Sequence, residues 1–95
     1  MQVSVRFFTS LRELVGKKEQ TLQFTQQTIT METALQTLTT QYGQAFNDYL
    51  FDQKTGHVKG FLQLLVNGKS VSSDDLKIEL HDGDVLAILP PVGGG

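Results

Sequence analysis

The sequence predicts an α+β domain in which a mixed β-sheet wraps around one main helix. Three observations predict this class. A single helical stripe of apolar residues, over about 31–42, stands between stretches whose apolar residues alternate with the period of two that marks strands. Asn67-Gly68 separates two strand-like stretches, the strongest short-range signal of a β-hairpin. With 95 residues, the chain suffices for one domain, which would bury roughly 60–65% of the unfolded surface.

The first expected element is a strand near the amino terminus. Val3, Val5 and Phe7 alternate with more polar neighbours, which is typical of a strand with one buried face. Phe8 departs from the pattern because it places a large aromatic side chain on the otherwise polar face.

A short helix over 11–15 should follow, with Ser10 as its N-cap and Gly16 at its end. Residues 20–24 then predict a second strand, antiparallel to the first, whose inward side chains are Leu22 and Phe24.

The main helix is expected over about 31–42. Thr30 is a favourable N-cap. Gly43 follows the last expected helical residue, where a residue in the left-handed conformation commonly ends a helix. The apolar residues fall on one face of this helix and are Met31, Ala34, Leu35, Leu38 and Tyr42. Threonine is frequent here and lowers helix propensity, so packing of this face must stabilise the helix.

After the helix, residues 45–51 indicate one more helical turn or an irregular cover, and 52–56 a turn. The remaining strands are expected at 61–66, at 69–71, around the alternating Leu76, Ile78 and Leu80, and at 85–89. This element order is that of a β-grasp domain, in which the first and last strands lie side by side and parallel at the centre of the sheet.

Composition excludes several classes of function. The formal charge of −2 and the absence of a Lys/Arg run argue against nucleic acid as a partner. No cysteine is present, so disulfides, thiolate nucleophiles and cysteine-ligated metals are excluded. No apolar run approaches membrane-spanning length and no signal peptide is recognisable, so we expect a cytoplasmic protein with no membrane partner.

The side chains form no catalytic constellation. His57 and His81 are isolated, and the carboxylates are scattered in a way that solvated faces and turns explain. Asp74-Asp75 is interpreted as the start of a helix or turn. No phosphate-binding or dinucleotide motif occurs. We therefore expect no bound metal or cofactor and no active site belonging to this chain alone.

The most informative stretch is residues 82–95. Asp82-Gly83 forms a turn, and 85–89 is an uninterrupted apolar run that suits a strand covered on both faces. Pro90-Pro91 ends strand pairing and favours an extended conformation, so that Val92 and Gly93-Gly94-Gly95 form a flexible tail over 90–95. With no reactive side chain in the tail, chemistry there must use the terminal carboxylate. The alternative interpretation is a tail without function.

This ending closely resembles the Pro-Pro-Val-x-Gly-Gly terminus of ubiquitin-like sulfur carriers, and the matching residues are Pro90-Pro91-Val92-Gly93-Gly94-Gly95. The nearest type is similar to the small subunit of molybdopterin synthase (MoaD) and its archaeal small-modifier relatives. The resemblance includes residues 7–16 and 65–68 and is weakest between about 42 and 60. It implies the β-grasp, or ubiquitin-like, fold that the element order also indicates.

The resemblance implies a mechanism at Gly95. A ubiquitin-activating-type adenylating enzyme would bind the domain, receive the tail, and use ATP to adenylate the Gly95 carboxylate. A persulfide-bearing enzyme would then supply sulfur for a thiocarboxylate. The acceptor would be the large subunit of molybdopterin synthase or another sulfur acceptor.

A docking patch for such partners is expected on the outer face of the sheet. If Leu86 and Ile88 point at the helix, Ala87 and Leu89 point away from it, beside Phe8 on the neighbouring strand. Phe8 and Leu89 match positions that contact partners in the resembled family. The alternative is that the segment around 43–60 covers this face as ordinary core.

Other functions remain open. The same activated terminus could join lysines through an isopeptide bond, as a protein modifier. A scaffold or toxin–antitoxin-type module would not need the tail at all. Thiamin-type carriers share the terminal Gly-Gly but lack Pro-Pro-Val.

Overall fold

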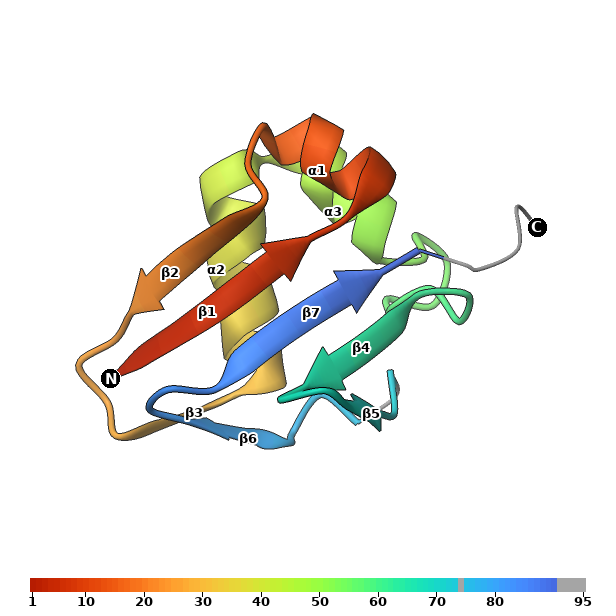
Figure 1. Cartoon of the computed structure of the whole chain (residues 1–95). Coiled ribbons are helices and arrows are strands. Elements are labelled where there is room, and N and C mark those ends of the chain that lie inside the picture. Colours follow the sequence, from red (N-terminus) through yellow and green to blue (C-terminus); the bar gives the residue numbers. More distant parts are fainter. Residues whose placement is uncertain (74, 91–95) are drawn as a thin grey trace.

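The structure is a computed structural model, and it describes residues 1–73 and 75–90. Within them a five-stranded sheet has the order β2-β1-β7-β4-β5, and a separate two-stranded sheet pairs β3 with β6 (Figure 1). The helices are α1 (Thr9–Val15), α2 (Met31–Tyr42) and α3 (Gln44–Leu50), and the strands are β1 (Gln2–Phe7), β2 (Glu19–Gln23), β3 (Thr28–Thr30), β4 (Gln63–Val66), β5 (Lys69–Val71), β6 (Glu79–His81) and β7 (Val85–Leu89). The prediction of an α+β, β-grasp domain is confirmed.

The centre of the sheet is formed by the first and last strands. β1 and β7 are parallel, with Phe7 opposite Ile88, and β4 pairs with β7 from its other side in the antiparallel sense. A continuous apolar run such as that of β7 is typical of a strand with neighbours on both sides and cover on its faces. The last strand of the chain is therefore the middle strand of the sheet.

Helix α2 crosses one face of the sheet and supplies much of the core (Figure 1). Thr30 caps it as predicted, its hydroxyl accepting a hydrogen bond from the Thr33 amide at 3.2 Å. Each long apolar side chain buried in this way contributes about 1.5–3 kcal/mol. The core residues of α2 are Met31, Ala34, Leu35 and Leu38, and they join those of β1, β4 and β7.

The segment after α2 extends the same core. Helix α3 replaces the single turn or irregular cover that we expected, and it buries Phe46 and Leu50, while Val58 follows in the next loop. Phe46 stacks on Tyr42, with ring centroids 5.8 Å apart, and meets Phe7 edge-on. Burial raises the pKa of the Tyr42 phenol above its ordinary value.

Two local predictions at helix ends need correction. Helix α1 begins at Thr9, so the N-cap position belongs to Phe8, and the Ser10 hydroxyl instead shares a 2.8 Å hydrogen bond with the Tyr49 hydroxyl. Gly43 ends α2 with positive φ, as expected, but its ψ of −163° lies outside the left-handed helical region because α3 starts directly after it.

Strands β5 and β7 have the predicted bounds, whereas two other strands differ by one or two residues from those predicted. The second strand is shifted to Glu19–Gln23, and the third begins at Gln63 because Lys59 to Leu62 form a turn. Residues 28–30 were not expected to form a strand, and of the stretch 76–80 only its end belongs to β6. The Asn67-Gly68 hairpin is confirmed, with φ of 52° and 83° as a type I′ turn requires.

Candidate functional site

The candidate site is the carboxyl end of β7, where the chain leaves the sheet. Leu86 and Ile88 are buried against the helix side, as predicted, and Ala87 and Leu89 lie on the opposite face and are half-buried. Pro90 is half-buried and is the last residue that the structure describes. The predicted tail residues Pro91, Val92, Gly93, Gly94 and Gly95 lie outside the described residues.

The strand register brings the predicted patch together. Phe7 lies opposite Ile88, so Phe8 follows β1 at the level of Leu89, and it is half-buried like Ala87 and Leu89. On the other side of β7, Leu65 pairs with Ala87 and Gln63 with Leu89. We call Phe8, Ala87 and Leu89 the sheet patch, and their role in binding a partner stays a prediction.

The alternative, in which the middle segment buries this face as core, is not what the structure contains. Phe46, Leu50 and Val58 of that segment are buried together with α2 in the main core. Phe8, Ala87 and Leu89 keep part of their surface exposed. Leu65, which the sequence analysis did not single out, belongs to the same face, and the strand alternation with Leu64 could have identified it.

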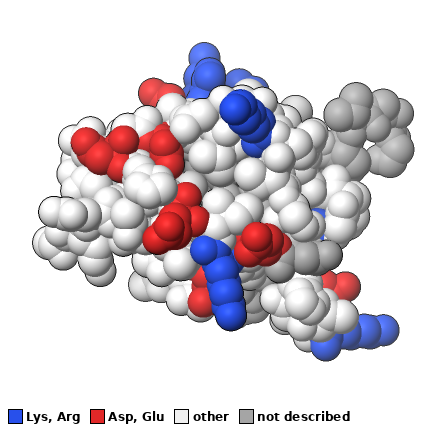
Figure 2. All heavy atoms as spheres, turned by 90° about the horizontal axis from the view of Figure 1, so that it is seen from below, with Lys and Arg blue, Asp and Glu red and all other residues white. Residues whose placement is uncertain are grey.

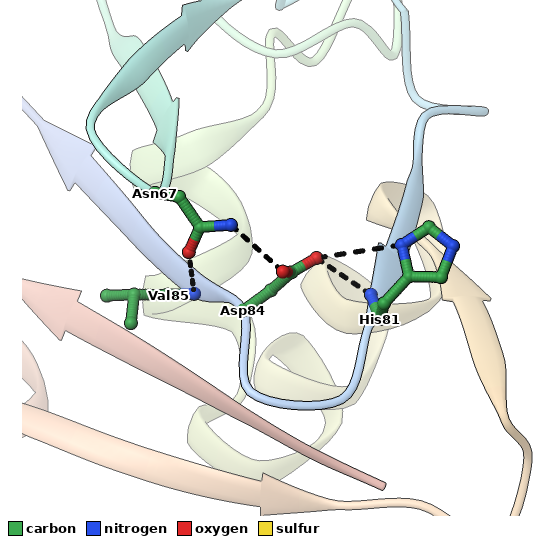
Figure 3. A network of polar contacts seen from close by, with 4 residues as sticks. All are labelled: Asn67, His81, Asp84 and Val85. Carbon is green, nitrogen blue, oxygen red and sulfur yellow. Dashed lines mark hydrogen bonds and ion pairs between the residues drawn. The ribbon is translucent and has the colours of Figure 1, made fainter.

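A network of polar contacts holds the start of β7 (Figure 3). Asp84 accepts hydrogen bonds from the His81 amide at 2.7 Å and from Asn67 Nδ2 at 2.9 Å. Asn67 Oδ1 in turn accepts from the Val85 amide at 2.9 Å. Two segments that are distant in sequence, the β4–β5 turn at Asn67 and the stretch 81–85, are thereby fixed to each other at the start of β7.

The histidines and carboxylates of the described residues form no obvious catalytic or metal site. No group of three or more potential ligands from His, Asp and Glu lies together in residues 1–73 and 75–90. His81 contacts Asp84 at 3.9 Å through Nδ1, and His57 is exposed in a turn. Asp75 accepts a hydrogen bond from the Lys77 amide, which agrees with its expected place in a turn, whereas Asp74 lies outside the described residues.

A cavity of about 450 Å³ lies between α2, α3 and the segment after α3, and its walls include Glu32, Thr39, Asn47 and Asp52. None of its lining residues belongs to the sheet patch. In the part of the chain that the structure describes, no helix is long and apolar enough to cross a membrane.

The fold and the terminal sequence together define the class of this protein as ubiquitin-like. The model of the ThiS family matches residues 5–95, and the chain belongs to this family of ubiquitin-like sulfur carriers and modifiers. Small archaeal modifier protein 3 of Haloferax volcanii is 32% identical over 96 residues, with both chains covered completely.

Solved structures show the same architecture. Small archaeal modifier protein 1 of Methanosarcina acetivorans is 32% identical, with a TM-score of 0.75 over 99% of this chain and 96% of that one. A protein described as subunit 1 of a molybdopterin converting factor from Pyrococcus furiosus has a TM-score of 0.75 over 97% and 99% of the two chains. Its identity of 24% makes it evidence for the fold alone.

Proposed function

We propose that this protein is a carrier whose Gly95 carboxylate is activated as an acyl-adenylate and converted to a thiocarboxylate. The observation that carries the proposal is the placement of the terminal motif. The central strand β7 ends directly in Pro90, and the rest of the chain, Pro91 to Gly95, has the sequence of an activated ubiquitin-like terminus. Family membership supports the same chemistry.

Adenylation is needed because the free carboxylate of Gly95 is a poor acyl donor. A free carboxylate is a weak electrophile, so a Gly95 oxygen attacks the α-phosphorus of ATP in the partner enzyme, and pyrophosphate leaves. The terminal sulfur of an enzyme persulfide then attacks the acyl-adenylate carbonyl and releases AMP. A second thiol cleaves the resulting S–S bond by forming a disulfide with the donor cysteine, which leaves sulfur on Gly95 as the thiocarboxylate.

This chain's own residues supply binding and presentation. The sheet patch docks the adenylating enzyme, and Pro90 and Pro91 direct Val92, Gly93 and Gly94 toward its active site. Glycine permits close approach to a channel wall because it has no Cβ. ATP is bound by the partner, so this chain needs no cofactor site.

For the acceptor, we propose the large subunit of molybdopterin synthase, which would use the sulfur to form the dithiolene of the pterin cofactor. The resemblance of the terminus to the MoaD type supports this choice. A second candidate use is conjugation of Gly95 to lysines, and the name of the Haloferax relative, a modifier protein, favours it. Both uses need the same acyl-adenylate.

Mass spectrometry of the protein isolated from its own cells tests the proposal. We expect an intact mass in which one oxygen is replaced by sulfur, located at Gly95 by fragmentation. Lysine peptides branched with the Gly95 terminus would instead establish the modifier function. If neither form is found, and the purified chain supports no ATP–pyrophosphate exchange with a ubiquitin-activating-type enzyme of the same cells, the proposal is wrong.

A further inference from the structure

Two pairs of a cation and an aromatic ring flank the end of β7. Arg6 Cζ lies 5.8 Å from the centre of the Phe8 ring, and Lys59 Nζ lies 6.0 Å from that of Phe61. Both distances are in the range of cation–π attraction. The pairs lie on opposite sides of Leu89, because β1 and β4 are the two neighbours of β7 and Gln63, two residues after Phe61, pairs with Leu89.

Phe61 is unusual in its exposure. The residue is 58% exposed, the highest value among the large hydrophobic residues described, and the next, Leu14, is 37% exposed. The backbone around it is nevertheless anchored, since the Lys59 amide donates to the Leu50 carbonyl and the Leu62 amide to the Lys59 carbonyl. Core packing therefore does not account for Phe61, which is held on a fixed turn with its ring in solvent.

On the Phe8 side, three cations line one small pocket. Arg6, Arg12 and Lys18 surround a volume of about 140 Å³ beside Phe8. Arg6 has one acidic neighbour, Glu19, at the long distance of 4.0 Å, and both side chains are more than half exposed. Within the described residues, no carboxylate lies within ion-pair distance of Arg12 or Lys18.

The other end of β7 lies beside acidic residues. Strand β6 and the residues between it and β7 carry Glu79, Asp82 and Asp84. The face seen from below has several acidic side chains, with a few lysine or arginine side chains among them (Figure 2). We call the end of β7, at Leu89 and Pro90, the tail exit. The chain as a whole has a formal charge of −2, so its overall composition does not explain the cations beside the tail exit. Such an asymmetry orients a protein as it approaches a charged partner.

We propose that the two pairs and the adjacent cations form a basic collar around the tail exit that docks on an acidic surface of the adenylating enzyme. The basic collar consists of Arg6, Phe8, Arg12, Lys18, Lys59 and Phe61. The inference rests on the proposed function and adds the charge of the partner surface and a specific anchor. Phe61 enters an apolar socket of the partner, and the cations face its carboxylates. In protein interfaces, buried aromatic anchors supply much of the affinity. Complementary charges at the rim orient the two partners.

The experiment measures ATP–pyrophosphate exchange by the adenylating enzyme of the same cells as a function of carrier concentration. The variants are Phe61→Ser and Lys59→Glu. We expect Phe61→Ser to raise KM by about tenfold or more with little change in kcat, because an anchor is lost and the tail is untouched. Lys59→Glu should raise KM at low salt, and raising the ionic strength should reduce the difference from wild type.

Matched controls come from outside the basic collar. Leu14→Ser removes the other exposed large hydrophobic side chain, and Lys77→Glu reverses a charge in the segment that leads into β6. Both should retain the wild-type KM within about twofold. Thermal melting of each variant checks that the fold is kept.

The outcomes separate the inference from the proposed function. If wild type is adenylated and both collar variants keep its KM, or if the controls lose as much as the collar variants, the basic collar is wrong while the carrier function stands. A fall in kcat alone would also overturn it, since docking would then be unaffected. If wild type itself supports no exchange, the carrier function fails and the basic collar with it.

Discussion

At the scale of single residues, the two glycines before the terminus should differ in their tolerance of a side chain. Gly94 adjoins the reacting carboxyl group of Gly95, whereas Gly93 occupies the variable position of the Pro-Pro-Val-x-Gly-Gly pattern. In a close-fitting channel, an added Cβ must displace a packed wall, which typically costs about 1–3 kcal/mol.

We therefore predict that Gly94→Ala slows adenylation or sulfur transfer by roughly ten- to a hundredfold, whereas Gly93→Ser is nearly silent. Initial rates with the partner enzyme, compared with wild type, measure the effect. Equal tolerance at the two positions would indicate a flexible tether in place of a threaded substrate.

At the scale of elements, neighbouring residues of β7 have opposite environments. Leu89 is half-buried on the outer face of the sheet, and Ile88 is 1% exposed on the inner face. An aspartate at position 88 would bury an unpaired charge, whereas one at position 89 can reach water.

Leu89→Asp should therefore remain folded but bind the adenylating enzyme at least about tenfold more weakly, and Phe8→Asp should behave in the same way. Ile88→Asp should lose about 4 kcal/mol or more of unfolding free energy, close to the whole stability of a small domain. Urea denaturation and a binding titration distinguish the two effects. Normal binding by a folded Leu89→Asp variant would remove the sheet patch from the docking surface.

The turn before β7 yields a second prediction at this scale. Asp84 accepts hydrogen bonds from the His81 amide and Asn67 Nδ2, so Asp84→Ala leaves two donors without this partner and should cost about 2 kcal/mol. Asp75→Ala is a suitable control, because Asp75 is exposed and accepts from the amide of Lys77 two residues away. Its cost should stay within about 0.5 kcal/mol in the same denaturation assay. Equal losses in the two variants would mean that the network does not hold β7.

Sequence patterns predicted the long elements well, and among the short strands they predicted β5, which the Asn67-Gly68 turn places, but missed β3 and the bounds of β6. Helix α2 has the predicted bounds because its apolar stripe and its cap, Thr30, agree. Strands β3 and β6 have three residues each, too few for an alternation to stand out, and they exist because they pair with each other. Ser10 has the chemistry of a cap, but tertiary structure directs its hydroxyl to Tyr49, a partner 39 residues away.

For the candidate site, alternation within β7 correctly predicted which of its side chains face outward. Phe61 was missed because its exposure depends on a turn at 59–62, which the sequence analysis assigned partly to a strand. The charge asymmetry was missed for a related reason. The cations of the basic collar are separated in sequence, and only strand pairing brings them to one end of the molecule.

At the scale of the whole molecule, folding and reactivity should be separable. Among the residues that the structure describes, the buried core extends from Val3 to Ile88, and a tail whose last three residues are glycine has no side chains there to bury. Deleting Gly94-Gly95 should therefore leave the unfolding free energy within about 0.5 kcal/mol of wild type, the range of ordinary surface changes. The same deletion should abolish ATP–pyrophosphate exchange, because the remaining terminal carboxylate is two residues short of the site of adenylation. Thermal melting and the exchange assay on one preparation measure both quantities. Exchange that persists in the truncated chain would show that the terminus is not the activated group, and a large loss of stability would show that the glycines are structural.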